Sequence, residues 1–108
     1  MNADDEFEKL RKAWPNVQVR ADAGQPIVYL PSFRFRSGGT DIMMDLLLYP
    51  RSHGSYTTRL FFRNQLSKGQ NWRSYFVCGE TWWAPSWQNV IADQPWISML
   101  ASHLQAVA

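Results

Sequence analysis

The sequence has one cysteine, Cys78, and two histidines in 108 residues. A single cysteine cannot form a disulfide within the chain, and these three side chains lack the ligand spacing of a zinc site. Residues 37–40 (SGGT) are the most glycine-rich stretch, but they lack the lysine and the spacing of a nucleotide-binding loop. We therefore expect no metal and no cofactor.

Long apolar runs are also absent. The longest, residues 42–49 (IMMDLLLY), is interrupted by Asp45 and is far shorter than the roughly 20 residues that cross a bilayer. Residues 1–10 are acidic where a secretory signal would be basic. The sequence thus predicts no membrane span and a cytoplasmic location.

The excess of positive charge is small, since 11 Lys and Arg stand against 9 acidic residues. Residues 33–36 (FRFR) nevertheless alternate aromatic rings with guanidinium groups, a pattern that can stack on bases and contact phosphates. The same alternation is typical of a strand with Phe33 and Phe35 inward and Arg34 and Arg36 outward. We favour the strand over nucleic-acid binding.

The chain length predicts one domain, residues 1–108, and 45% hydrophobic residues suffice for a core. Phe7, Leu10 and Trp14 recur at helical spacing after an acidic first turn, and Pro15 ends that helix. A second apolar stripe over residues 96–107, which includes His103, predicts a C-terminal helix.

Residues between the helices read as consecutive strands separated by turns, which favours an antiparallel arrangement. We expect an α+β fold with an N-terminal helix, a four-stranded antiparallel meander, a tryptophan-rich loop carrying Cys78, and a C-terminal helix. Cys78 follows a strand-like run and precedes Gly79. The residues alone leave open whether it is a small core side chain or a displayed nucleophile.

Three segments carry a resemblance: MDLLLYPRSHGSYTTRLFF, then NWRSYFVCGETWWAPSW, then WISMLASHLQAVA. Their order resembles that of ubiquitin-conjugating enzymes, and most closely the compact bacterial members of that family. The resemblance implies that Cys78 accepts a ubiquitin-like protein as a thioester and that Asn71 stabilises the oxyanion. It also implies that Lys9, Arg11 and Lys12 dock an activating enzyme.

The tryptophan-rich segment takes part in the same resemblance, because Trp83, Ala84 and Pro85 occupy the place of the family's Trp-Ser-Pro motif. We expect Trp82, Trp83, Pro85 and Trp87 to contribute to partner binding, with Trp83 also anchoring the loop.

Two functions follow. In the first, Cys78 receives a ubiquitin-like protein from an activating enzyme and passes it to an amine of a target protein. In the second, the same fold is a non-catalytic adaptor that binds a ubiquitin-like protein or a partner subunit, and Cys78 is buried. The reactivity of the thiol separates the two.

Overall fold

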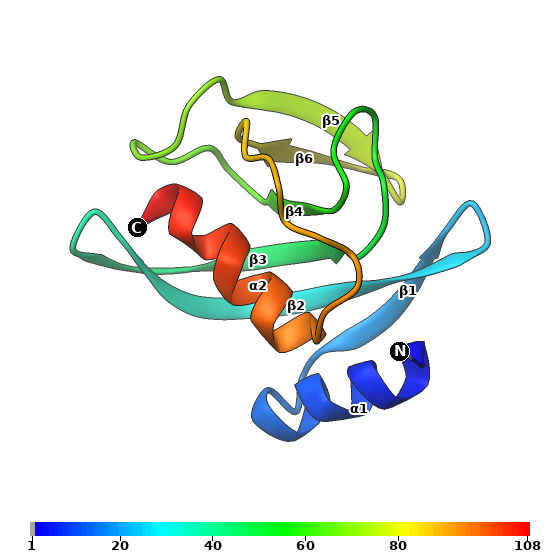
Figure 1. Cartoon of the computed structure of the whole chain (residues 1–108). Helices are drawn as coiled ribbons and strands as arrows, with labels where there is room; N and C mark the ends of the chain where they lie inside the picture. The colour runs from blue at the N-terminus through cyan, green and yellow to red at the C-terminus, as the bar shows by residue number, and fades with distance from the viewer. Residues whose placement is uncertain (1) are drawn as a thin grey trace.

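The computed structural model describes residues 2–108. The elements in chain order are α1 (Ala3–Ala13), β1 (Gln18–Asp22), β2 (Gln25–Ser37), β3 (Thr40–Tyr49), β4 (Arg59–Phe62), β5 (Arg73–Val77), β6 (Glu80–Ala84), α2 (Trp96–Leu104) and the short 3-10 helix η1 (Gln105–Val107). Figure 1 shows one sheet with both α-helices on the same side. The α+β class and the two terminal helices are as the sequence predicts.

The first helix begins and ends where its sequence indicates. The side chain of Asn2 accepts hydrogen bonds from the N–H groups of Asp4 and Asp5, at 2.8 and 3.3 Å, and so caps the first turn. Trp14 ends the helix, and Pro15 cannot continue it.

The sheet has six antiparallel strands in the order β1-β2-β3-β4-β6-β5, not the four expected. The first four strands are neighbours in chain order, and the hairpin β5–β6 adds the other two. The expected tryptophan-rich loop is therefore wrong in part, because Trp82 and Trp83 lie within β6. Aromatic residues on both sides of a tight turn favour this hairpin.

Three hairpins have two-residue turns with successive positive φ angles, as in a type I′ turn. They are Ala23-Gly24 (φ 52° and 77°), Gly38-Gly39 (57° and 80°) and Cys78-Gly79 (51° and 77°). Cys78 thus occupies the turn position that Ala23 and Gly38 occupy in the other two hairpins.

The long strand β2 contains an irregularity between Leu30 and Phe33. Ser32 has a φ of 48°, and its N–H donates to a carboxylate oxygen of Asp45 at 2.8 Å. Beyond it, Phe33 is buried and Arg34 is exposed, so the predicted alternation in residues 33–36 is confirmed.

Both faces of the sheet are buried. The face covered by α1 and α2 includes Leu10, Val28, Leu30, Leu46, Leu48, Leu60, Phe62, Trp96, Met99 and Leu100. The other face includes Ile27, Leu47, Tyr49, Phe61, Val77, Trp82 and Ala84. Successive residues of a strand point to opposite faces, which explains why β3 and β4 are apolar without interruption at Leu46–Tyr49 and Leu60–Phe62.

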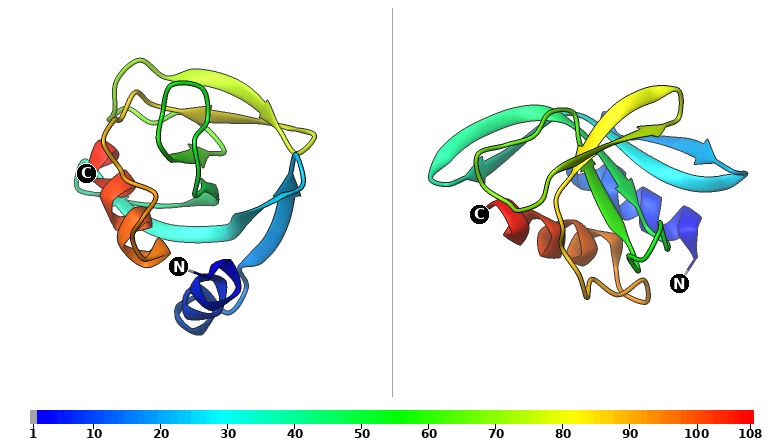
Figure 2. Two further views of the ribbon diagram at one scale, coloured as in Figure 1. Left: turned by 45° about the vertical axis from the view of Figure 1, so that its right-hand side comes forward. Right: turned by 90° about the horizontal axis from the view of Figure 1, so that it is seen from above.

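The second face is enclosed because the sheet rolls. Figure 2 shows that the turns of the hairpins β1–β2 and β5–β6 come close together. Arg20 of β1 pairs with Glu80 of β6 at 3.3 Å, and Sγ of Cys78 lies 3.4 Å from the carbonyl oxygen of Ala21. These contacts join opposite sides of the sheet. No helix among residues 2–108 is long and apolar enough to cross a membrane.

Candidate functional site

Cys78 is half-buried at the β5–β6 turn and packs beside the second face of the sheet. Its Sγ–H donates to the carbonyl oxygen of Ala21. The equivalent position in the β1–β2 turn is Ala23, with almost the same φ. The backbone at this turn therefore accepts any small residue that tolerates a positive φ, and a thiol is not required for the turn itself.

The surroundings of Cys78 hold its thiol protonated. Burial raises the pKa of Cys78 above its ordinary value, and the carboxylate of Asp22 raises it further, while Arg20 opposes them and Glu80 adds to the increase. Reactive cysteines instead lie in electropositive surroundings that lower the pKa. The site disfavours a thiolate at neutral pH.

Asn71 lies at the opposite end of β5 from Cys78. At a rise of about 3.3 Å per residue, the two residues are roughly 20 Å apart. The N–H of Ser86 donates to the carbonyl oxygen of Gln70 at 2.8 Å, which fixes the Asn71 end beside residues that follow β6. The structure does not bring Asn71 to the thiol.

The basic residues of α1 are exposed, as a docking face requires, but two of them have acidic partners. Lys9 pairs with Glu6 at 3.2 Å, and Arg11 pairs with Glu8 at 2.7 Å. Hydrogen bonding to Arg11 lowers the pKa of Glu8, against a smaller effect of desolvation. Lys12 is also exposed. The positive charge of this face is therefore largely compensated.

The tryptophan-rich segment divides between core and surface. Trp82 is 0% exposed on the second face of the sheet, so its predicted role in partner binding is wrong. Trp83 is half-buried on β6, and Pro85 is buried. Trp87 remains exposed, and its indole N–H donates to the carbonyl oxygen of Ser102 at 3.0 Å.

The two histidines lie in different surroundings. His103 is buried on α2, with Nε2 2.9 Å from Oγ1 of Thr58. Burial lowers the pKa of His103 to about 4, and the charge of Arg59 contributes. His53 lies in the loop after β3, where burial and then Arg59 lower its pKa. Packing of His103 agrees with its position on the apolar stripe.

A pocket that the sequence did not indicate lies at the Asn71 end of the hairpin. It encloses about 470 Å³ and is lined by Tyr56, Arg59, Asn71, Arg73, Tyr75 and Ser86. No acidic side chain lines it. The only sequence signal was the position of Arg59 directly before the apolar run Leu60–Phe62, because a charged residue at a buried strand position is unusual.

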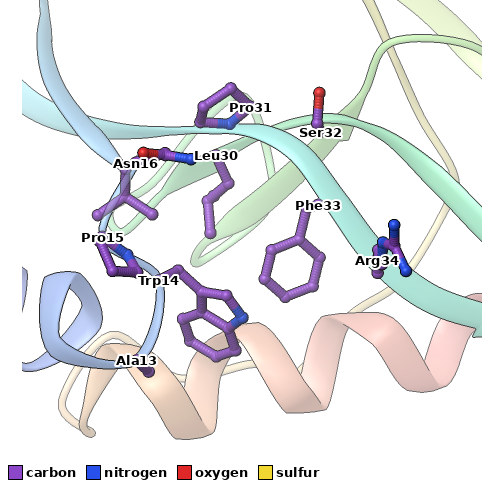
Figure 3. A pocket seen from close by; sticks show the side chains of 10 residues that line it. Ala13, Trp14, Pro15, Asn16, Leu30, Pro31, Ser32, Phe33 and Arg34 are labelled. Atoms are coloured by element: carbon purple, nitrogen blue, oxygen red, sulfur yellow. The ribbon is translucent and has the colours of Figure 1, made fainter.

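A second pocket, of about 280 Å³, lies between the end of α1 and the irregular part of β2. Figure 3 shows Trp14, Leu30 and Phe33 along it, with Arg34 at one side. The rings of Trp14 and Phe33 are 5.0 Å apart. Its walls are mainly apolar, and no cysteine, histidine, aspartate or glutamate lines it.

Comparison with protein-family models, with curated proteins and with solved structures found no match for the chain. Among residues 2–108 no three or more His, Cys, Asp and Glu side chains cluster in a way that could hold a metal ion. The assignment of function therefore depends on the geometry of the sites and on the resemblance in sequence.

Proposed function

We propose that the protein is a non-catalytic adaptor of the ubiquitin-conjugating fold, which binds a ubiquitin-like protein or a partner subunit without carrying it as a thioester. The observation that supports this most directly is the environment of Cys78. Its Sγ–H donates to the carbonyl oxygen of Ala21, and both burial and Asp22 raise its pKa. A thiol is a poor nucleophile compared with a thiolate, so this environment favours binding over transfer.

The competing proposal is the acyl carrier, in which Cys78 accepts a ubiquitin-like protein from an activating enzyme and passes it to an amine. That reaction needs a thiolate near neutral pH and a hydrogen-bond donor close to the oxyanion. Asn71 was the expected donor, but it lies at the far end of β5 from Cys78. The geometry of these two residues therefore supports the adaptor.

The order of elements is compatible with the proposed fold. A helix precedes four strands that pair in chain order, and a second helix follows the hairpin that carries Cys78. That order is the one the sequence resemblance implies. The added strands β5 and β6 occupy the segment that carries the acceptor cysteine in the family.

The surface offers places for a partner to bind. Phe76 is 76% exposed on β5, which is an edge strand of the sheet. An exposed aromatic ring beside unpaired backbone groups suits docking of another chain. Trp87 is also exposed and provides an amphipathic ring elsewhere on the surface.

The first test measures the rate of alkylation of Cys78 by iodoacetamide in the folded protein as a function of pH. We expect a midpoint above the ordinary thiol value of about 8.5 and a rate that increases on unfolding, because burial and Asp22 disfavour the thiolate. The matched control is the Ala23→Cys, Cys78→Ala variant, which moves the thiol to the equivalent position of an exposed turn. Its thiol should react faster and with a lower midpoint.

The second part of the test separates binding from transfer. Ubiquitin serves as the probe and is titrated into the protein labelled with ¹⁵N, and we expect the protein and its Cys78→Ser variant to bind ubiquitin equally. A Cys78 midpoint below about 8.5 would contradict the adaptor. Formation of a thiol-sensitive conjugate after incubation with ubiquitin, an activating enzyme and ATP would establish the acyl carrier instead.

A further inference from the structure

Arg59 is a buried cation without an acidic partner. The residue is 4% exposed on the central strand β4, and among residues 2–108 no carboxylate lies within ion-pair distance of it. Its Nε is buried and makes no hydrogen bond. Its Nη2 makes only a long contact, 3.4 Å, to the carbonyl oxygen of Pro85. Burial of an uncompensated charge is costly, so its presence requires an explanation.

Two tyrosine rings hold the guanidinium group of Arg59 in place. The guanidinium carbon lies 3.7 Å from the ring centre of Tyr56 and 4.6 Å from that of Tyr75. Such contacts attract a cation to the faces of the rings but do not neutralise its charge. The rings therefore orient the guanidinium while leaving its hydrogen-bonding capacity for a ligand.

The rest of the pocket adds hydrogen-bond donors. Arg73 supplies a second guanidinium group, and the amide of Asn71 supplies further N–H groups. The hydroxyl of Tyr56 donates to Oγ of Ser86 at 3.2 Å, so the hydroxyl proton of Ser86 remains free to donate to a ligand. Two positive charges with no acid in the walls suit a doubly charged anion.

We propose that the pocket lined by Arg59, Arg73, Asn71 and Ser86 binds a phosphate group. The guanidinium of Arg59 lies at the floor of the pocket, and Arg73 is exposed at its rim. A phosphomonoester is a dianion with three acceptor oxygens at neutral pH, which matches two guanidinium groups and two neutral donors. The pocket, about 470 Å³, also leaves room for the group that carries the phosphate.

Neighbouring titratable groups do not supply the missing negative charge. Asp22 and Glu80 lie at the other end of the β5–β6 hairpin, beside Cys78. His103 and His53 are the titratable neighbours on which the charge of Arg59 acts, and neither is anionic. The negative charge that compensates the guanidinium of Arg59 must therefore come from a ligand, from outside residues 2–108 or from solvent.

The test is a titration of the ¹⁵N-labelled protein with inorganic phosphate, followed by NMR at the backbone amides of Tyr56, Asn71, Arg73 and Ser86. We expect saturable shifts at these amides, and weaker binding of acetate, which carries a single charge. Potassium chloride at equal ionic strength is the control for screening. Shifts of the same size with chloride, or no saturation at these amides, would overturn the proposal.

Two variants and a matched control assign the binding to the pocket. Arg73→Gln removes an exposed guanidinium and should weaken phosphate binding about tenfold or more, the effect of losing a charged hydrogen bond. Arg59→Met replaces the cation with an apolar side chain of similar length. It should abolish phosphate binding while the protein stays folded by circular dichroism. Arg34→Gln removes an exposed guanidinium from β2 and should leave the affinity unchanged. Equal weakening by Arg34→Gln and Arg73→Gln would overturn the proposal.

The same titration with phenyl phosphate and with a short phosphoserine peptide distinguishes the source of the phosphate. Tighter binding of the peptide than of phenyl phosphate assigns the phosphate to a modified protein, and the reverse assigns it to a small phosphorylated molecule. Both results support the pocket as a phosphate site. Neither depends on whether a ubiquitin-like protein binds elsewhere on the surface.

Discussion

His103 shows how one side chain couples burial to pH. The hydroxyl of Thr58 donates to the carbonyl oxygen of Val90 at 2.8 Å, so it accepts from His103, whose Nε2 carries the proton. Burial lowers the pKa of His103 to about 4, and Arg59 adds a smaller effect. The imidazole is therefore neutral in the folded protein near pH 7.

This predicts a loss of stability in acid. Between pH about 6.5 and about 4 the unfolded chain binds a proton at His103 that the folded protein does not, so the free energy of unfolding decreases as the pH falls. This difference between the pKa of His103 in the unfolded and folded states corresponds to a change of about 3 kcal/mol in the free energy of unfolding. Urea unfolding at several pH values measures it. The control, His103→Gln, keeps an N–H donor without titrating, and an unchanged pH dependence in that variant would contradict the assignment.

At the scale of elements, the two α-helices are joined by one buried carboxylate. Glu6 of α1 is 3% exposed and accepts a hydrogen bond of 2.9 Å from the N–H of Trp96, the first residue of α2. Pro95 has no side-chain hydrogen bond to offer at this helix end. Glu6 thus acts as the N-terminal cap of a helix that lies 90 residues later in the chain.

The carboxylate of Glu6 should therefore stabilise the packing of the helices. Burial alone would raise its pKa, but the hydrogen bond from Trp96 and the ammonium group of Lys9 bring it below the ordinary value of 4.5. The stabilisation of the fold by ionised Glu6 is present above about pH 4.5, and it is lost as the pH falls through the lowered pKa. Glu6→Gln should cost about 1 to 3 kcal/mol at pH 7 in thermal unfolding. Glu8→Gln, which alters only the exposed pair with Arg11, should change little, and an equal loss in both would argue against the cap.

At the scale of the whole molecule, Glu80 closes the rolled sheet. It pairs with Arg20 of β1 at 3.3 Å and with Arg63, the residue after β4. Arg20 lies over the ring of Tyr29 at 3.9 Å, and Arg63 lies over the ring of Trp82 at 4.7 Å. One carboxylate therefore connects three parts of the sheet across the enclosed face.

Glu80→Gln should loosen this closure. We expect a lower midpoint of thermal unfolding and faster alkylation of Cys78, because the contact between Cys78 and Ala21 depends on the same closure. Asp41→Asn is the matched control, since Asp41 of β3 forms an exposed pair with Arg36 of β2 at 3.7 Å. Equal alkylation rates of Cys78 in the two variants would show that Glu80 does not hold the hairpin turns together.

Local patterns predicted the elements better than they predicted the sites. The spacing of Phe7 and Leu10 and the alternation in residues 33–36 depend on neighbours in sequence, and both were confirmed. The register of the β5–β6 hairpin decides toward which face of the sheet the Trp82 side chain points. A shift of one residue would place Trp83 on that face instead. The resemblance placed Asn71 near Cys78 by spacing alone, whereas the extended strand between them keeps them apart.

Contacts between distant parts of the chain could not be predicted in this way. The bond from Trp96 to Glu6 joins residues 90 positions apart, and no local pattern marks it. The pocket around Arg59 likewise combines residues from the loop before β4, from β5 and from the segment after β6. Only the folded topology brings them together.

The buried position of Arg59 has a consequence for the natural variation of this sequence. Replacement of a buried charge by an apolar side chain of similar size is often neutral or stabilising, so drift under selection for folding alone would remove this arginine. Homologues that no longer bind the ligand should therefore have an apolar residue at position 59, and the residue at position 73 should vary freely among them. Homologues that keep the ligand should retain both arginines together, and the pair would then identify the descendants in which the pocket is still used.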